Sequence, residues 1–206
     1  MKVLENVQSK NMWPTTTYTF SLKNVDNNLL KKEILEREQK GLGFRFVPMQ
    51  GGGWQSNKNL LYDNWPKETS NPIFKDLRKS LFIGVNKILS EIYIDDATIK
   101  MINSWANISR KSEYTMPHIH EEASWSCVYY VTPTEDANLY FKDPRLLEHM
   151  DKSHHHLKQP YANVIKKRPF DAGEAILFPS WLEHGVGPAT KDVIRISIAS
   201  NFLIEG

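Results

Sequence analysis

Three histidines and one arginine in the second half of this 206-residue chain have a spacing that could serve metal chemistry. His118 and His120 are two residues apart, so on a β-strand both imidazoles would point to the same face. His184 follows much later, and Arg195 lies eleven residues beyond it. Imidazole suits iron, zinc, copper and nickel, and oxygen-activating iron also requires open coordination positions. The set therefore predicts a metal centre with an anion-binding arginine beside it.

The arginine lies in a segment, residues 193–199, in which apolar and other residues alternate as in a strand. Arg195 and Ser197 share one face with Asn201, and isoleucines occupy the other face. A buried arginine needs a partner for its charge. A dicarboxylate, held bidentately by the guanidinium with the hydroxyl of Ser197 alongside, would be one. The alternatives are a structural salt bridge or a solvated outer face.

Helices and strands that could position these residues divide the chain into two parts. A helix is expected from Asp26 or Asn27 to Lys40, followed by a stop at Gly41. A second helix has Asn71 as its N-cap, and its apolar face is expected to extend as far as residue 92. Residues 51–57 are expected to form a loop, because three consecutive glycines disfavour a regular element. The candidate strands are residues 99–109, 114–120, 126–132, 139–142, 175–178 and 193–202.

This order of elements predicts a mainly β fold with flanking helices, in which the strands form a sandwich or barrel. Residues 1–98 would form an N-terminal helical and loop region that supports the core, and residues 99–206 would form the core itself, together one structural domain. Residues 133–169 are loop-rich and are expected to form a rim or lid over the site.

Composition narrows the class of protein. The formal net charge is +2, from 26 basic and 24 acidic residues, so charge gives no reason to expect a nucleic acid partner. Cys127 is the only cysteine, which favours a reducing compartment. The N-terminal residues lack the apolar stretch of a secretory signal, and no apolar run approaches the ~20 residues of a membrane helix. We therefore expect a cytoplasmic protein, with its oligomeric state left open.

A set of motifs in a fixed order is more specific than any of these features alone. The chain resembles the 2-oxoglutarate- and Fe(II)-dependent oxygenases, and more closely a largely uncharacterised subgroup that occurs in bacteria and phages. The similarity extends from roughly residue 51 to residue 202. The motifs that carry it are Gly53-Trp54-Gln55-Ser56, Ser104-Trp105-Ala106-Asn107, Pro117-His118-Ile119-His120, Ser126-Cys127-Val128-Tyr129-Tyr130-Val131, Asp143-Pro144-Arg145, Phe178-Pro179-Ser180-Trp181 with His184, and Arg195-Ile196-Ser197 with Asn201.

The resemblance implies a double-stranded β-helix (jelly-roll) core and a dioxygenase or hydroxylase that uses Fe(II), 2-oxoglutarate and O2. It implies His118, His120 and His184 as metal ligands. Arg195 would bind the distal carboxylate of 2-oxoglutarate with Ser197, and Asn107 would supply a further polar cosubstrate contact. The cosubstrate would yield succinate and CO2 while a C–H bond of the substrate is hydroxylated. The substrate, a small molecule or a protein side chain, is not indicated.

One position departs from the pattern of the superfamily. Most members supply a carboxylate two residues after the first histidine, where this chain has His120. Either His120 is itself the third ligand, or His120 and Glu122 form the pair and His118 is a supporting residue. The three-histidine site is preferred, because the subgroup pattern centres on the two close histidines. A neutral triad would also leave more positive charge on the metal for an anionic cosubstrate.

Other functions on the same architecture stay open. A cupin-type metalloenzyme, an isomerase or a dioxygenase, would need no 2-oxoglutarate and would leave Arg195 without a ligand. A non-catalytic jelly-roll that binds a partner is a third interpretation. Of the remaining candidates, His149 and residues 154–156 are expected to be surface histidines, and Cys127 to be buried. Trp125 and Trp181 are the tryptophans expected to line a pocket.

Overall fold

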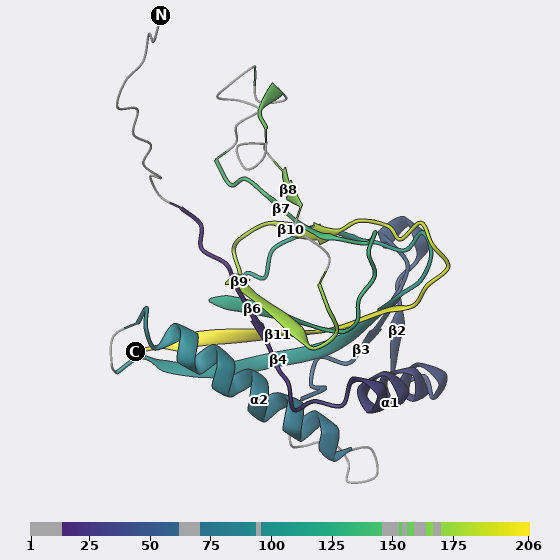
Figure 1. Cartoon of the computed structure of the whole chain (residues 1–206), viewed down its shortest axis with the longest axis horizontal. Coiled ribbons are helices and arrows are strands. Elements are labelled where there is room, and N and C mark those ends of the chain that lie inside the picture. The colour runs from purple at the N-terminus through teal and green to yellow at the C-terminus, as the bar shows by residue number, and fades with distance from the viewer. Residues whose placement is uncertain are drawn as a thin grey trace, which may run out of the picture.

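The computed structural model describes residues 14–61, 71–93, 96–145, 153, 156–158, 164–166 and 170–206. Two antiparallel sheets lie one above the other, and both helices lie below the larger sheet in Figure 1. The larger sheet has the strand order β1-β9-β6-β11-β4-β3-β2, and the smaller one β5-β10-β7-β8. The strands are β1 Tyr18–Ser21, β2 Gly43–Arg45, β3 Trp54–Ser56, β4 Thr98–Ser109, β5 Thr115–His118, β6 Trp125–Thr132, β7 Leu139–Lys142, β8 Val164–Lys166, β9 Glu174–Pro179, β10 His184–Val186 and β11 Arg195–Glu205, and η1 Pro48–Gln50 is a short 3-10 helix.

Both predicted helices are present. α1 (Asn27–Gln39) is capped by Asp26, whose carboxylate accepts hydrogen bonds from two backbone N–H groups of the first turn. α2 (Pro72–Leu89) is capped by Asn71, whose amide oxygen accepts a hydrogen bond from the backbone N–H of Ile73. The expected extension of the apolar face to Ile92 is wrong, because α2 ends at Leu89 and Ile92 is exposed. In the described part of the chain neither helix is long and apolar enough to cross a bilayer.

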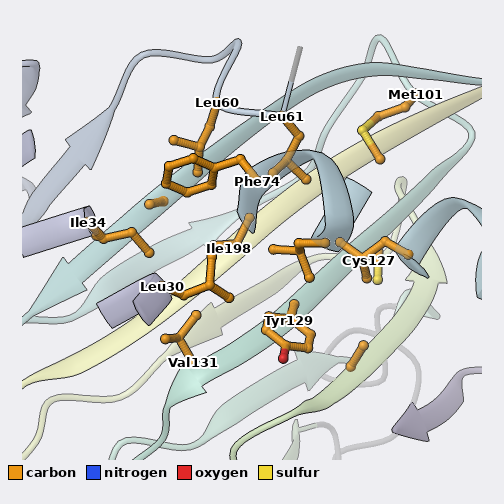
Figure 2. Close-up of a cluster of buried hydrophobic side chains, with 14 of the residues drawn as sticks. Leu30, Ile34, Leu60, Leu61, Phe74, Met101, Cys127, Tyr129, Val131 and Ile198 are labelled. Atoms are coloured by element: carbon orange, nitrogen blue, oxygen red, sulfur yellow. The ribbon is translucent and has the colours of Figure 1, made fainter. Parts of the chain in front are cut away.

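The first of two cores lies between the helices and one face of the larger sheet. Figure 2 shows this cluster, which joins Leu30 and Ile34 of α1 and Leu60 and Leu61 of the loop before α2 with Cys127, Tyr129 and Val131 of β6. These three residues alternate along the strand, so their neighbours Val128 and Tyr130 face the opposite sheet. Burial of this face fixes the strand register, because a shift of one residue would turn every side chain over.

The second core fills part of the space between the two sheets. Its members are Tyr130, Ala137, Leu139, Phe141, Phe170, Ile176, Phe178, Leu182, Val186 and Ala189. Strand β11 therefore separates two environments. Ile196 and Ile198 pack toward the helices, while Arg195 and Ser197 face the space between the sheets, as the alternating pattern predicts. The mainly β fold with a jelly-roll core and flanking helices is confirmed.

Several short elements differ from the sequence prediction. The expected loop at residues 51–57 contains β3, which pairs with β4 directly after three glycines with positive φ. β8 lies in a stretch expected to be loop, and β1, β2 and β10 were not predicted. β5 ends at His118, so His120 lies beyond the strand. Strands from the first 61 residues thus join the larger sheet, and the division of the chain at residue 98 stays a prediction.

Candidate metal centre

The three predicted histidines meet at one end of the space between the sheets. His118 on β5 and His184 on β10 are register partners on neighbouring antiparallel strands, with ring centroids 4.4 Å apart. The ring of His120 lies 4.9 Å from that of His118 and 5.1 Å from that of His184. One potential ligand atom from each histidine lies within 4.8 Å of the other two. This arrangement suits a single metal ion with three imidazole ligands.

Hydrogen bonds fix which nitrogen of each ring faces the other two. The Nδ1 atom of His118 lies 2.8 Å from the carbonyl oxygen of Met116, and that of His184 lies 2.8 Å from the carbonyl oxygen of Leu182. Because a carbonyl oxygen can only accept, both Nδ1 atoms carry the proton and donate it. Each Nε2 atom is then left with a lone pair. A second hydrogen bond of this kind is typical of histidines that bind metals.

The ring of His120 is held by side chains of the larger sheet, whereas the other two rings are held by nearby backbone carbonyl groups. Its Nδ1 atom donates to the amide oxygen of Asn201 on β11, at 2.7 Å, and lies 2.9 Å from the hydroxyl of Ser126 on β6. The Ser126 hydroxyl also donates to the same amide oxygen, at 2.8 Å. The centre is therefore built by both sheets, with two histidines paired on the small sheet and the third tied to the large one.

Burial keeps the imidazoles of His184 and His120 neutral. The pKa of His184 is lowered to about 3, mainly because burial penalises the charged ring, and the neighbouring His118 adds to the effect. Burial also lowers the pKa of His120, although its hydrogen bond to Asn201 opposes the change. Neutral imidazole is the form that binds a metal ion, so this site is prepared for one at neutral pH.

Glu122 is placed differently from the histidines. It lies in an exposed turn two residues after His120, and it lines the same cavity. Since β5 ends at His118, the strand alternation that would put Glu122 beside His120 does not apply. Among the described residues, the group of side chains close enough to share one ion consists of the three histidines without Glu122.

A cavity of about 830 Å³ opens beside the histidines, between the two sheets. Three polar residues form one row across its wall, since Ser197 of β11 pairs with Asn107 of β4, and Asn107 pairs with Gln55 of β3. All three line the cavity. The structure therefore brings the predicted cosubstrate residues Ser197 and Asn107 side by side, and adds Gln55, which belongs to a motif of the resemblance but was not predicted as a site residue.

Arg195 lies in the same cavity and is 97% buried by its neighbours, with only 3% of its surface exposed. Its Cζ atom lies 5.7 Å from the ring centre of Tyr130. Burial lowers the pKa of Arg195, but a guanidinium remains charged in proteins. Burial also raises the pKa of Tyr130 to about 12, so this phenol does not supply a negative charge at neutral pH. Within the described part of the chain, no carboxylate forms an ion pair with Arg195.

The predictions about tryptophans were wrong. Trp125 is buried in the core on the helix side, where its indole N–H donates to the hydroxyl of Tyr93. Trp181 is 53% exposed and does not line the cavity. Trp105 does line it, with its ring centre 5.6 Å from that of His120. Its position two residues before Asn107 on one strand was the available signal, because residues two apart share a face.

The remaining candidates lie away from the centre. Cys127 is buried in the core on the helix side, as predicted. His156 is exposed. His149, His154 and His155 lie outside the described residues, and so does most of the predicted rim or lid.

Comparisons with known proteins agree with this geometry. Residues 103–201 match a family model described as "Putative 2OG-Fe(II) oxygenase". A search of curated proteins found no match in sequence. Among solved structures, the carbocyclase SnoK of nogalamycin biosynthesis, described as non-heme and alpha-ketoglutarate-dependent, has a TM-score of 0.66 at 11% identity, over 91% of this chain and 79% of that chain. A prolyl-4-hydroxylase of Pseudomonas putida has a TM-score of 0.56 at 14% sequence identity, over 92% of this chain and 93% of that chain. HygX of Streptomyces hygroscopicus, solved with nickel and 2-oxoglutarate bound, has a TM-score of 0.60 at 11% sequence identity, over 91% of this chain and 82% of that chain.

Proposed function

We propose that this chain, which carries a 2OG-Fe(II) oxygenase domain over residues 103–201, binds Fe(II) through the Nε2 atoms of His118, His120 and His184. Arg195 and Ser197 hold the distal carboxylate of 2-oxoglutarate, and Asn107 adds a polar contact from the neighbouring strand. The enzyme hydroxylates a C–H bond of its substrate, with succinate and CO2 as co-products.

The observation that carries the proposal is the buried Arg195. An unpaired buried charge costs several kcal/mol, so a fold that maintains one gains when an anion binds beside it. Arg195 faces the cavity that also contains the three histidines, and no described carboxylate neutralises it. A dicarboxylate that reaches from the metal to the guanidinium fits this arrangement, and the forked guanidinium binds carboxylates bidentately.

The protein's own contribution is to position the metal ligands and the cosubstrate and to exclude water. Hydrogen bonds from the three Nδ1 atoms hold the imidazoles in one tautomer and orientation. Ala199 faces the cavity between Trp105 and Val128 of the adjacent strands, and its small side chain leaves room for the cosubstrate. When bound, Fe(II) with 2-oxoglutarate and O2 supplies the oxidising chemistry. Buried walls around the site keep water from competing with the substrate.

The setting in which the enzyme works is a further part of the proposal. The resemblance to bacterial and phage proteins and the single cysteine support the cytoplasm of a bacterium or of a phage-infected bacterial host. The substrate is a small molecule or a protein side chain.

The test is an anaerobic titration of the purified chain with Fe(II) and 2-oxoglutarate, followed by the visible metal-to-ligand charge-transfer band. We expect a band in the wild type and in Glu122→Gln, no band in His184→Ala, and a large loss of 2-oxoglutarate affinity in Arg195→Leu. Loss of the band in Glu122→Gln would place a carboxylate among the ligands. A metal-loaded wild type without a band would refute the oxygenase function and favour a cupin-type metalloenzyme or a binding protein.

A further inference from the structure

The polar row of Ser197, Asn107 and Gln55 extends beyond the proposed cosubstrate contacts, and its far end, with Lys58, forms a separate part of the cavity wall. Gln55 on β3 is 92% buried, with 8% of its surface exposed, and lines the cavity. Its backbone pairs with β2 and β4, but no hydrogen bond to its side-chain amide occurs among the described residues. Its amide atoms are not among the fully buried polar atoms that lack a partner, so the amide is accessible from the cavity. This side chain is therefore available to a ligand that enters the cavity.

Lys58, three residues later, adds a positive charge to the same wall. Its backbone carbonyl accepts a hydrogen bond from the N–H of Ser104, at 2.8 Å, so its position is tied to β4. Its Nζ atom lies 5.7 Å from the ring centre of Trp105, the tryptophan that packs against His120. In the described part of the chain no carboxylate pairs with this ammonium group. An exposed cation thus lies over the face of Trp105, whose ring packs against His120.

The position of this wall separates it from the proposed cosubstrate site. Strand order places Gln55 beyond Asn107, on the side away from Ser197 and Arg195. Neighbouring strands are about 4.8 Å apart, so the Gln55 strand lies about 10 Å from the strand that carries Arg195. Gln55 and Lys58 also lie outside the matched residues 103–201. The wall is therefore contributed by residues before the matched range, and Gln55 belongs to the Gly53-Trp54-Gln55-Ser56 motif, one of those on which the resemblance to the bacterial and phage subgroup rests.

We propose that Gln55 and Lys58 form the substrate-recognition wall and that the substrate carries a carboxylate. Lys58 pairs with this carboxylate, and the Gln55 amide donates a hydrogen bond to the substrate. The inference rests on the proposed function, since it assumes that Arg195 is occupied by 2-oxoglutarate. With Arg195 neutralised in this way, Lys58 is the remaining cation among the described residues that line the cavity.

Two features of the cavity mouth define the rest of the substrate. Glu121 and Glu122 line the cavity and balance the charges of Lys58 and Arg195, so selection of a substrate carboxylate depends on the local position of Lys58. Phe44, Met116 and Ile119 also line it and are each more than 40% exposed. Exposed apolar side chains of this kind indicate contact with a ligand or partner. A carboxylate attached to an apolar body, as a free acid or as an acidic residue of a peptide, fits both features.

The experiment measures binding to the full chain loaded with Zn(II) and 2-oxoglutarate, so that no turnover occurs. Calorimetry compares matched pairs that differ only in charge. These are 3-phenylpropionate with 3-phenylpropanamide, N-acetyl-aspartate α-amide with N-acetyl-asparagine α-amide, and end-blocked hexapeptides that contain one Glu or one Gln. We expect at least one carboxylate to bind tenfold or more tightly than its amide, and the pair that shows this identifies a free acid or a peptide as the source.

Variants assign the effect to the wall. Lys58→Met should abolish the preference for the carboxylate, and Lys58→Arg should retain it. Gln55→Leu should weaken the binding of both the carboxylate and the amide of the pair. Lys32→Met, on the exposed surface of α1, is the matched control and should change nothing. 2-Oxoglutarate affinity should stay within twofold in all four variants.

Three results would overturn the inference. One is equal binding, or no binding, of every pair to the wild type, and another is a preference that survives Lys58→Met. The third is a loss of 2-oxoglutarate affinity in Gln55→Leu or Lys58→Met, which would assign the wall to the cosubstrate. Failure of the wild type to take up 2-oxoglutarate would instead refute the proposed function.

Discussion

Replacement of Asn201 by leucine tests whether the larger sheet orients the metal centre. The amide oxygen of Asn201 accepts a hydrogen bond from Nδ1 of His120 at 2.7 Å. Leucine has a similar size but cannot accept this bond, so the ring is free to rotate or to change tautomer. His120 should then be a poorer ligand, while His118 and His184 keep their backbone partners.

The expected magnitude follows from what remains around the ring. Loss of a hydrogen bond to a metal-binding histidine typically costs 10–100-fold in metal affinity. Ser126 lies 2.9 Å from the same Nδ1 atom, and its hydroxyl can turn its proton toward Ser180, 2.8 Å away, and then accept from His120. We therefore expect about a tenfold loss in Asn201→Leu, and about a hundredfold loss when Ser126→Ala is added.

The assay is a Co(II) or Fe(II) titration in competition with a chelator of known affinity. Ser200→Ala is the matched control, because this neighbouring hydroxyl is fully buried, without a hydrogen-bond partner in the described structure, and faces the opposite side of β11. It should leave metal affinity within twofold of the wild type. Unchanged affinity in the double variant, with its fold intact by circular dichroism, would refute the view that the large sheet orients His120.

Three further predictions concern stability and reactivity. The pKa of His184 is lowered to about 3, whereas an unfolded histidine titrates near 6.5, so the unfolded chain binds this proton first as the pH falls. The free energy of unfolding of the metal-free protein, measured with urea, should therefore fall by a few kcal/mol more in the wild type than in His184→Gln between about pH 6.5 and pH 3. An equal fall in the two proteins would contradict this. Cys127 is 1% exposed and burial raises the pKa of its thiol, so a thiol reagent should label it only on unfolding, and rapid labelling of the native chain would disprove its burial. A Cβ atom on Gly185 would lie 2.5 Å from the Tyr140 hydroxyl and 2.8 Å from the carbonyl oxygen of Thr115. Gly185→Ala should therefore lower the free energy of unfolding by about 1–3 kcal/mol and weaken metal binding. Gly187→Ala, with open space around the added Cβ atom, should change neither quantity.

The predictable parts of the fold are those with strong local signals. Asp26 and Asn71 cap helices because their side chains satisfy free N–H groups, and this requires only neighbouring residues. The long strands β6 and β11 show alternating or apolar runs. β3 and β10 have three residues each, which is too short for a pattern. Their pairing with distant strands decides their structure, and a single sequence does not display that pairing.

The site was predictable where chemistry is coded by residue type and spacing, and less so where it depends on register. The histidines and Arg195 were found from their order in the chain. The support of His120 by Asn201 and Ser126 depends on the pairing of β11 with β6, in which these two residues are partners. Trp125 was misplaced because its side chain lies on the helix-facing side of β6, whereas the next residue, Ser126, faces the metal centre. Gln55 was part of a motif of the resemblance, but its place in an expected glycine-rich loop gave no strand alternation from which its direction could be predicted.

The choice of ligands and the proposed substrate class are linked through charge. Three neutral imidazoles, Fe(II), the 2-oxoglutarate dianion and the Arg195 guanidinium sum to +1, whereas a carboxylate in place of one imidazole would bring the sum to zero. A positive centre attracts a substrate carboxylate near His120 more strongly than a neutral centre does, and the difference grows in a cavity with few waters. A neutral triad therefore favours a carboxylate beside Lys58, whose ammonium lies 5.7 Å from the ring of Trp105, the tryptophan that packs against His120. With Glu122 as a ligand, the preference for the carboxylate of each matched pair should be smaller, so the calorimetric preference also reports on the metal ligands.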